Sequence, residues 1–358
     1  MNNRILIVGG YGAVGRHISA TLAETHPNRV IVAGRDFEKA KDFSLSLNSG
    51  VIPLQFDIFS VQDGDTLLNG IFLVIMCIDQ KNSNFVKQCI YKGIHYIDIS
   101  ATYDFLASIE LLNENAVQHN STVMLSIGTV PGISNLLASH CKNLYPEIRD
   151  VEIFVLLGLG EAHGEAAIRW SLDQLDSQFF IQKNGSLMQA QSFEDGKSTL
   201  FPGSMIQRMT YRFNFSDQHV ITKTLNLESA STRICFDSKA MTYLYTLLKK
   251  FGFGRLLKRK HVQNLVIRLL RSFRFGSNQV AVKVEARIHP NEEPVYACSI
   301  HGNEEARITG LVAAMVADRV MESKLPHGVF HIEQCIDPLE LIEELKGHGV
   351  FFDECIFN

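Results

Sequence analysis

The sequence lacks several features that mark whole classes of protein. Its seven cysteines form no C-x-x-C pair, which argues against a disulfide framework or a structural zinc site and favours the reducing cytoplasm. No run of about 18 apolar residues is present, so a membrane-spanning helix is not expected. The first apolar run, Arg4 to Val8, is too short for a secretory signal peptide. The formal net charge is only -4, so the whole molecule offers no attraction to nucleic acid.

The chain does have enough apolar residues for a substantial core. Of its 358 residues 46% are hydrophobic, and the mean hydropathy is +0.05. This length and composition predict a folded protein of two domains rather than a disordered or fibrous chain.

Residues 1–130 alternate between short apolar runs and helical patterns. Apolar strands separated by helices are typical of a parallel sheet covered on both faces. We therefore expect a doubly wound α/β domain with a Rossmann sheet. The expected strands are Arg4 to Val8, Val30 to Ala33, Val51 to Phe56, Ile71 to Cys77, His95 to Ile99 and Thr122 to Ile127, and one long helix is expected from Tyr103 to Gln118.

The pattern changes after Pro131. Strand signals follow one another without crossover helices, and Asn184-Gly185 is a strong hairpin signal. Gln279 to Ile288 alternates between apolar residues and charged ones, which predicts an antiparallel strand with one side facing water. We expect residues 131–303 to form an α+β domain with a mixed or antiparallel sheet that binds substrate and forms a homodimer. Residues 304–358 are expected to be helices that return to the first domain.

A glycine-rich segment follows the first expected strand and opens the first helix. Gly10, Gly12 and Gly15 make the pattern G-x-G-x-x-G. The first glycine allows a tight turn, the second lets the backbone approach a pyrophosphate, and the third lets helix and strand pack closely. The anion would lie on the N–H groups at the helix N-terminus. The expected cofactor contacts in this segment are Gly10, Tyr11, Gly12, Ala13, Val14 and Gly15.

The residue after the second strand determines which of the two nicotinamide cofactors, NAD or NADP, is preferred. NAD enzymes usually place an acidic residue there to bind the ribose diol, whereas this chain has Arg35. A guanidinium binds a 2′-phosphate through a charge-assisted fork, so we expect NADP. The alternative is that Arg35 is solvated and Asp36 binds the ribose.

Two other strand ends are expected near the cofactor. Asp57 either edges the adenine pocket or caps the next turn. Cys77 and Ile78 end the fourth strand, where ligands cross an open α/β sheet, although a buried, inert thiol is the preferred interpretation for Cys77.

Three later motifs accompany the glycine segment and the Ala33-Gly34-Arg35 strand end. They are H-Y-I-D-I-S at 95–100, G-T-V-P-G-I-S-N at 128–135 and H-G-E-A-A-I-R-W at 163–170. In this order the motifs resemble the saccharopine dehydrogenase family, in particular its saccharopine-reductase-like NADP-binding members. The resemblance is clearest over the first 135 residues. It implies an enzyme that oxidises or reduces a C–N bond of an amino-acid adduct with NAD(P), in a cleft between its domains.

The resemblance also implies roles for single residues. The chain lacks the longer insertion found near the Trp-Ser segment in the lysine-pathway reductases, which argues against saccharopine itself as the substrate. The residues expected at the cofactor on this basis are Gly128 and Pro131, and those expected at the substrate are Ser100, Gly132, Asn135, Trp170 and Ser171.

The chemistry leaves the catalytic residues open. An iminium needs orientation and electrostatics more than a strong general acid, whereas a ketone needs a proton donor. His163 is the candidate donor, with a loop histidine bonded to the backbone as the alternative. Asp98 either orients a substrate amine or caps the next helix, and Trp170 either lines the pocket or fills the core of the second domain.

A basic stretch, residues 249–274, contains nine Lys or Arg and no acidic residue. We consider a solvated helical hairpin with buried leucines first, a positive rim that attracts a carboxylate-bearing substrate second, and contact with a membrane surface last. The function predicted for the chain is an NADP-dependent oxidoreductase acting on a C–N bond of a small carboxylate-bearing substrate. The alternative is a catalytically idle NADP sensor that regulates a partner.

Overall fold

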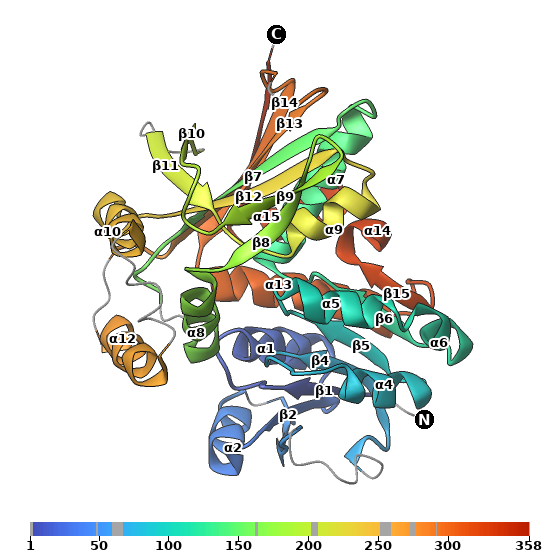
Figure 1. The fold of residues 1–358 in the computed structure, drawn as a ribbon. Helices are drawn as coiled ribbons and strands as arrows, with labels where there is room; N and C mark the ends of the chain where they lie inside the picture. Colours follow the sequence, from blue (N-terminus) through green and yellow to red (C-terminus); the bar gives the residue numbers. More distant parts are fainter. Residues whose placement is uncertain are drawn as a thin grey trace. The chain divides into compact units, whose positions relative to one another are not determined.

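The computed structural model describes residues 3–47, 49–58, 67–161, 164–201, 207–250, 259–272, 276–290 and 292–357. The chain divides into two compact units. Unit 1 comprises Met1–Gly128 and Thr309–Cys335, and unit 2 comprises Thr129–Ile308 and Ile336–Asn358. Figure 1 shows the ribbon coloured along the sequence.

Unit 1 is built on a parallel sheet. Its strand order over the described residues is β15-β6-β5-β4-β1-β2-β3, and each neighbouring pair runs parallel. The order from β3 to β6 is that of a dinucleotide-binding Rossmann domain, so the predicted doubly wound sheet is confirmed. The strands are β1 (Arg4–Val8), β2 (Val30–Gly34), β3 (Ile52–Gln55), β4 (Ile71–Met76), β5 (His95–Asp98), β6 (Thr122–Leu125) and β15 (Gly328–His331).

Helices connect these strands and bury their apolar faces. Helix α1, for example, buries Ile18 and Leu22, which lie one turn apart on the same face. The helices of this unit are α1 (Gly15–Thr25), α2 (Phe37–Ser46), α4 (Asn84–Tyr91), α5 (Tyr103–Glu110), α6 (Asn113–Gln118), α14 (Ile332–Cys335) and most of α13 (Glu305–Met321).

The single helix expected from Tyr103 to Gln118 is wrong, because the structure breaks it into α5 and α6. Leu111, at the break, is 83% exposed, whereas the apolar stripe stays buried on both sides of the break, at Phe105, Ile109, Leu112 and Ala116. Asn113 then accepts a hydrogen bond from the backbone N–H of Val329 in β15 (2.9 Å). The break therefore lets the start of α6 bind a strand that the sequence pattern did not predict.

Residues 304–358 also differ from the expectation that they are helices of the first domain. The boundary between the units falls within α13, and β15 and α14 belong to unit 1. Helix α15 (Pro338–Lys346) and strand β16 (Phe351–Ile356) belong to unit 2. The physical reason is pairing: β15 extends the parallel sheet beside β6, whereas β16 pairs with β14.

Unit 2 contains a mixed sheet and a separate hairpin, as expected for an α+β domain. Over the described residues the sheet order is β10-β11-β12-β7-β13-β14-β16, in which β12 and β7 run parallel and the other neighbours antiparallel. The predicted Asn184-Gly185 turn joins β8 to β9 with positive φ at both residues. The strands are β7 (Asp150–Leu157), β8 (Gln178–Lys183), β9 (Ser186–Gln191), β10 (Lys197–Leu200), β11 (Gln207–Arg212), β12 (Ser229–Phe236), β13 (Gln279–Arg287) and β14 (Tyr296–Asn303).

Helices of unit 2 cover the apolar side of this sheet. Helix α7 contacts β13 and β14, and α9 contacts β12. The helices of this unit are α7 (Ser134–Leu144), α8 (Glu165–Gln174), α9 (Asp217–Thr224), α10 (Lys239–Lys250), α12 (Lys260–Ser272) and α15. Among the described residues no helix is both long and apolar enough to cross a membrane.

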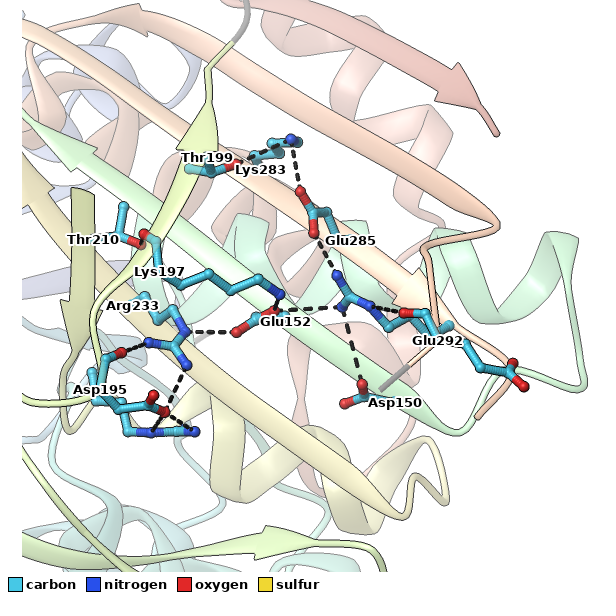
Figure 2. A network of polar contacts seen from close by, with 12 residues as sticks. Asp150, Glu152, Asp195, Lys197, Thr199, Thr210, Arg233, Lys283, Glu285 and Glu292 are labelled. Atoms are coloured by element: carbon cyan, nitrogen blue, oxygen red, sulfur yellow. Dashed lines mark hydrogen bonds and ion pairs between the residues drawn. The ribbon is translucent and has the colours of Figure 1, made fainter. Parts of the chain in front are cut away.

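The polar side of β13 does not face water, so that expectation is wrong. Glu285 and Arg287 are buried and form an ion pair (2.6 Å), and Lys283 bonds Glu285 (2.8 Å). Figure 2 shows these side chains in one network with Glu152 of β7. Mutual pairing lets the charges lie on the sheet away from solvent. The polar side of β13 is therefore not available to a second subunit, and the homodimer stays a prediction.

Candidate functional site in unit 1

The glycine segment forms a close cradle between β1 and α1. The backbone N–H groups of Gly9 and Gly10 both donate to Ala33 O (2.8 and 3.3 Å), which holds the loop against β2. A Cβ atom at Gly15 would collide with Gly9 O, and one at Gly10 would lie 2.9 Å from Ile7 O. The loop therefore needs glycine at both positions, as expected from the motif.

The start of α1 is suited to an anion. Its N-cap residue, Val14, makes no side-chain cap, and no acidic residue lies in the first turn. N–H groups at such a helix start attract a phosphate, and Gly12, Ala13 and Val14 are only half-buried there. The cradle and the helix start together fit the diphosphate of a dinucleotide.

Tyr11 fixes the loop to the end of β2, a role that the motif did not reveal. Its hydroxyl accepts a hydrogen bond from the backbone N–H of Asp36 (3.1 Å). Its ring lies on Gly34, where an added Cβ would collide with it. The sequence signal for this contact is the pairing of a large aromatic residue in the loop with a glycine at the second strand end.

Arg35 and Asp36 have different environments. Asp36 caps α2: its carboxylate accepts from Lys39 N (3.2 Å) and lies 3.3 Å from Lys39 Nζ. The hydrogen bond from Lys39 N, followed by that from its side chain, lowers the pKa of Asp36. Arg35 is exposed, and its carbonyl accepts from the Gln55 side chain (3.1 Å). The basic side chain at this strand end is thus open to a ligand, while the acidic one already has partners.

Lys39 adds a second cation that the sequence reasoning missed. Its side chain is 71% exposed and lies one helical turn after Asp36. The i, i+3 spacing at the start of α2 was the available signal, because residues three apart share one helix face.

The segment after β4 lies against the glycine loop, whereas Asp57 is half-buried two residues after β3. Ile78 approaches the loop so closely that a Cβ atom at Gly9 would lie 2.8 Å from its Cγ2 atom. Burial raises the pKa of the Cys77 thiol, so the thiolate is disfavoured, in agreement with an inert residue.

A hollow of about 270 Å³ also lies in unit 1. It is formed by residues after β3, after β4 and on α4. One of its residues, Gln80, has a buried Oε1 atom that lacks a hydrogen-bond partner in the described part of the chain. The lining residues are Ile58, Gln80, Lys81, Asn82, Asn84, Phe85 and Gln88.

Asp98 is the centre of a buried hydrogen-bond cluster at the end of β5. Only 1% of it is exposed. Its carboxylate accepts from the Tyr96 hydroxyl (2.7 Å), from Ser100 N (2.7 Å) and from Gln80 Nε2 (3.3 Å). Burial raises the pKa of Asp98 to about 6, although the bonds from Tyr96, Ser100 and Gln80 oppose this shift. The partners are neutral, so the carboxyl group has an unusual affinity for a proton.

The cluster excludes one of the two roles expected for the side chain of Asp98. Asp98 does not cap the next helix, since Thr102 is the N-cap residue of α5. It instead holds the backbone at Ser100, which is half-buried and accepts weakly from Thr102 N (3.4 Å).

The turn after β6 spans Thr129–Ile133 in unit 2, directly after the buried Gly128 of unit 1. Asn135 is fully buried, and its Oδ1 atom accepts from the N–H of Gly132 (3.1 Å) and from Ser134 Oγ (3.4 Å). Gly132 has φ +137°. Asn135 therefore fixes the turn that holds Pro131 and Gly132, rather than presenting its side chain to solvent.

Trp170 belongs to an aromatic cluster of unit 2. Its ring lies 5.8 Å from that of Phe213 and 5.4 Å from that of Phe215, and it is half-buried, like Ser171. The packing agrees with the core interpretation and leaves part of the ring accessible. The candidate donor His163 lies outside the described residues. Among the residues that are described, no cluster of three or more His, Cys, Asp or Glu could hold a metal ion.

The structure thus gathers the sequence-predicted residues of unit 1 at the carboxyl edge of one parallel sheet. Ligands bind at this edge in open α/β sheets. Fold and loop together define a dinucleotide-binding α/β protein. Residues 5–124 match the family described as the saccharopine dehydrogenase NADP binding domain. This part of the chain is therefore similar to the NADP-binding domain of saccharopine dehydrogenases, in agreement with the sequence motifs.

A solved structure shares the fold. Saccharopine dehydrogenase (L-Glu forming) from Saccharomyces cerevisiae in its apo form matches 99% of this chain and 100% of its own, with 15% identity and a TM-score of 0.71. A meso-dapdh mutant with DAP from Clostridium tetani E88 matches 96% and 99%, with 16% identity and a TM-score of 0.44. No curated protein sequence matches the chain. The NADP-binding domain supports an oxidoreductase with a nicotinamide cofactor.

Proposed function

We propose that the protein is an NADP-dependent oxidoreductase that moves a hydride to or from a C–N bond of a small, carboxylate-bearing substrate. When bound, the nicotinamide ring supplies or accepts the hydride. The observation that supports NADP is the exposed Arg35 at the end of β2, beside an aspartate that is already bound to Lys39. Arg35 would bind the 2′-phosphate, and Lys39 would add a second positive charge.

In unit 1 we assign binding and positioning roles. The N–H groups of Ala13 and Val14, two half-buried residues at the start of α1, would bind the diphosphate, whereas the N–H of Gly12 already donates to Gly9 O (2.8 Å). Asp98 would position Ser100, the residue expected to contact the substrate, through its hydrogen bond to Ser100 N. Its burial excludes water from this carboxyl group and keeps its proton affinity high.

In unit 2 we assign Asn135 to positioning, because it holds the Gly132 turn by a direct hydrogen bond. Trp170 and Ser171 would contact the hydrocarbon part of the substrate, since both are partly accessible on α8. His163 stays our candidate proton donor for a ketone substrate. For an iminium substrate, orientation and charge suffice.

Cofactor preference is tested by measuring the dissociation constants of NADPH and NADH for the native protein and for Arg35→Ala. A charge-assisted hydrogen bond contributes roughly 1.5–3 kcal/mol, so NADPH should bind on the order of 10- to 150-fold more tightly than NADH. Arg35→Ala should lose this preference without weakening NADH.

Arg29→Ala is the matched control, because Arg29 is an exposed arginine at the opposite, amino end of β2. It should keep the native preference. Equal affinities in the native protein, or an unchanged preference in Arg35→Ala, would contradict the assignment.

Turnover is tested with NADPH, a panel of 2-keto acids and a panel of amines, by following the absorbance of NADPH. Reductive coupling of at least one pair is expected. Tight NADPH binding without turnover on any pair would instead favour the regulatory sensor.

A further inference from the structure

The charges of this protein are unevenly divided along the chain. Residues 238–284 contain eleven Lys or Arg and no Asp or Glu, whereas the remaining residues contain 23 Lys or Arg and 38 Asp or Glu. One segment of unit 2 is therefore strongly basic within an acidic protein. Such asymmetry indicates an anionic partner for that segment rather than for the whole molecule.

Helix α12, within this segment, exposes a leucine, although Val262 and Val266 are half-buried and Ile267 is buried. It packs on α8, where Gln263 Oε1 accepts from Arg169 (3.2 Å) and Arg169 also bonds Asn264 (3.0 Å). Gln263 and Ile267 are buried, whereas Leu265 is 58% exposed. An amphipathic helix of a globular protein normally buries its leucines and exposes its glutamine. The reverse arrangement here leaves an apolar side chain for another surface.

The exposed side of α12 is also basic. Lys260, His261 and Arg268 are exposed around Leu265. Cations and leucine thus share one helix surface, which is typical of helices that lie in the interface plane of a lipid bilayer.

Helix α10 repeats this combination. Tyr243 is 65% exposed and Leu244 is 41% exposed, and Lys239 and Lys250 are exposed at the two ends of the helix. Figure 1 shows both α10 and α12 towards the left of the view. A tyrosine with an apolar ring and a polar tip is suited to the boundary between lipid and water.

We propose that α10 and α12 bind the surface of an anionic phospholipid membrane. The lysines and arginines would contact the phosphate groups, while Leu265, Tyr243 and Leu244 enter the boundary between headgroups and acyl chains. The exposed apolar side chains favour lipid over nucleic acid, because a phosphate backbone offers them no apolar surface. This inference is independent of the proposed enzymatic function.

The direct test is flotation of the full chain with vesicles of phosphatidylcholine, with and without phosphatidylglycerol, at low and high salt. The protein should float only with the phosphatidylglycerol vesicles, and less so at high salt, because surface charge attraction is screened. A fluorescently labelled DNA duplex serves as the competing anionic probe.

Variants of α12 separate the electrostatic contribution to vesicle binding from the apolar contribution. Each cation near an anionic surface contributes about 1 kcal/mol, or roughly 5-fold, so Lys260→Ala with Arg268→Ala should weaken vesicle binding on the order of 30-fold. Leu265→Ser should weaken vesicle binding roughly 5- to 10-fold, because the proposed apolar contact with the lipid is lost. Circular dichroism and thermal unfolding establish that each variant is folded.

Matched controls come from unit 1. Leu111→Ser replaces a leucine that is 83% exposed, and Arg29→Ala with Lys41→Ala removes two exposed cations. These variants should float as the native protein does. Failure to float with anionic vesicles, equal flotation of the α12 variants and the controls, or binding to the duplex without binding to vesicles would each overturn the proposal.

Discussion

Two buried carboxylates, one in each unit, show how surroundings set the chemistry of the same group. Asp98 in unit 1 is surrounded by neutral donors, and burial raises its pKa to about 6. Glu152 in unit 2 contacts Lys197, Arg233 (2.6 Å) and Arg287 (3.5 Å). Burial would raise its pKa, but the charges of Arg233 and Lys197 outweigh burial and lower it. Asp98 in unit 1 can therefore hold a proton up to about pH 6, whereas Glu152 in unit 2 is ionised at this pH.

The network around Glu152 connects strands that are distant in sequence. Arg233 of β12 also bonds Asp195, which in turn pairs with Arg212 of β11 (2.6 Å). Asp150, at the start of β7, lies 4.0 Å from Arg287, and burial raises its pKa to about 6. The ion pairs therefore fix β7 against its neighbours, and any change at Glu152 should affect the whole of unit 2.

The largest effect is expected from Glu152→Gln. It leaves Arg233 and Lys197 without their buried counter-charge, which should lower the free energy of unfolding by roughly 3–5 kcal/mol, as measured by urea denaturation. Glu228→Gln is the control, since it breaks the exposed Arg149–Glu228 pair of the same unit and should cost less than about 1 kcal/mol. Equal losses in the two variants would remove the distinction between a buried and an exposed pair.

A smaller effect with a definite pH dependence is expected from Asp98→Asn. The folded-state pKa of Asp98 is raised, so ionised Asp98 opposes folding above about pH 6, and this penalty disappears as the pH falls towards the unfolded value near 4. From well above pH 6 to well below pH 4 the complete difference amounts to about 3 kcal/mol. Native stability should therefore gain from this group as the pH falls from 6 to 4, and Asp98→Asn should lack that gain.

Denaturation curves at several pH values measure this difference. Asp42→Asn, at an exposed position of α2, serves as the control and should leave the pH dependence unchanged. If Asp98→Asn and the native protein show parallel curves between pH 4 and 7, the high proton affinity of Asp98 is wrong.

The smallest effect is expected from Tyr96→Phe, which removes the hydroxyl that donates to Asp98. Because that bond stabilises the ionised carboxylate, its loss should raise the pKa of Asp98 further and cost about 1.5–3 kcal/mol at pH 7. The cost should shrink at pH 4, where Asp98 is protonated. Tyr91→Phe, at a tyrosine that is 58% exposed, should change stability little at either pH. A cost that does not vary with pH would argue against the bond to the ionised form.

Local patterns were sufficient for much of the fold. The apolar runs of β1, β2 and β4 are strand-length and fully or nearly fully buried, so their periodicity identified them correctly. The Asn184-Gly185 turn forms as predicted, because these residues tolerate positive φ. Strands β15 and β16 were missed because each is stabilised by its partner strand rather than by its own sequence pattern, and β15 has only four residues.

The sequence by itself determined the glycine cradle, the basic residue at the end of β2 and the likeness of residues 5–124 to a known NADP-binding domain, because these depend on residues close together in the chain. The tertiary structure decided which charges are buried. The alternating charges of β13 predict a solvent-facing side, but in the structure Glu285 pairs with Lys283 and Arg287 of the same strand, and Glu152 of the neighbouring β7 supplies a further counter-charge to Arg287. Likewise, burial raises the pKa of Asp98, and burial depends on how the whole unit packs, which no local sequence pattern encodes.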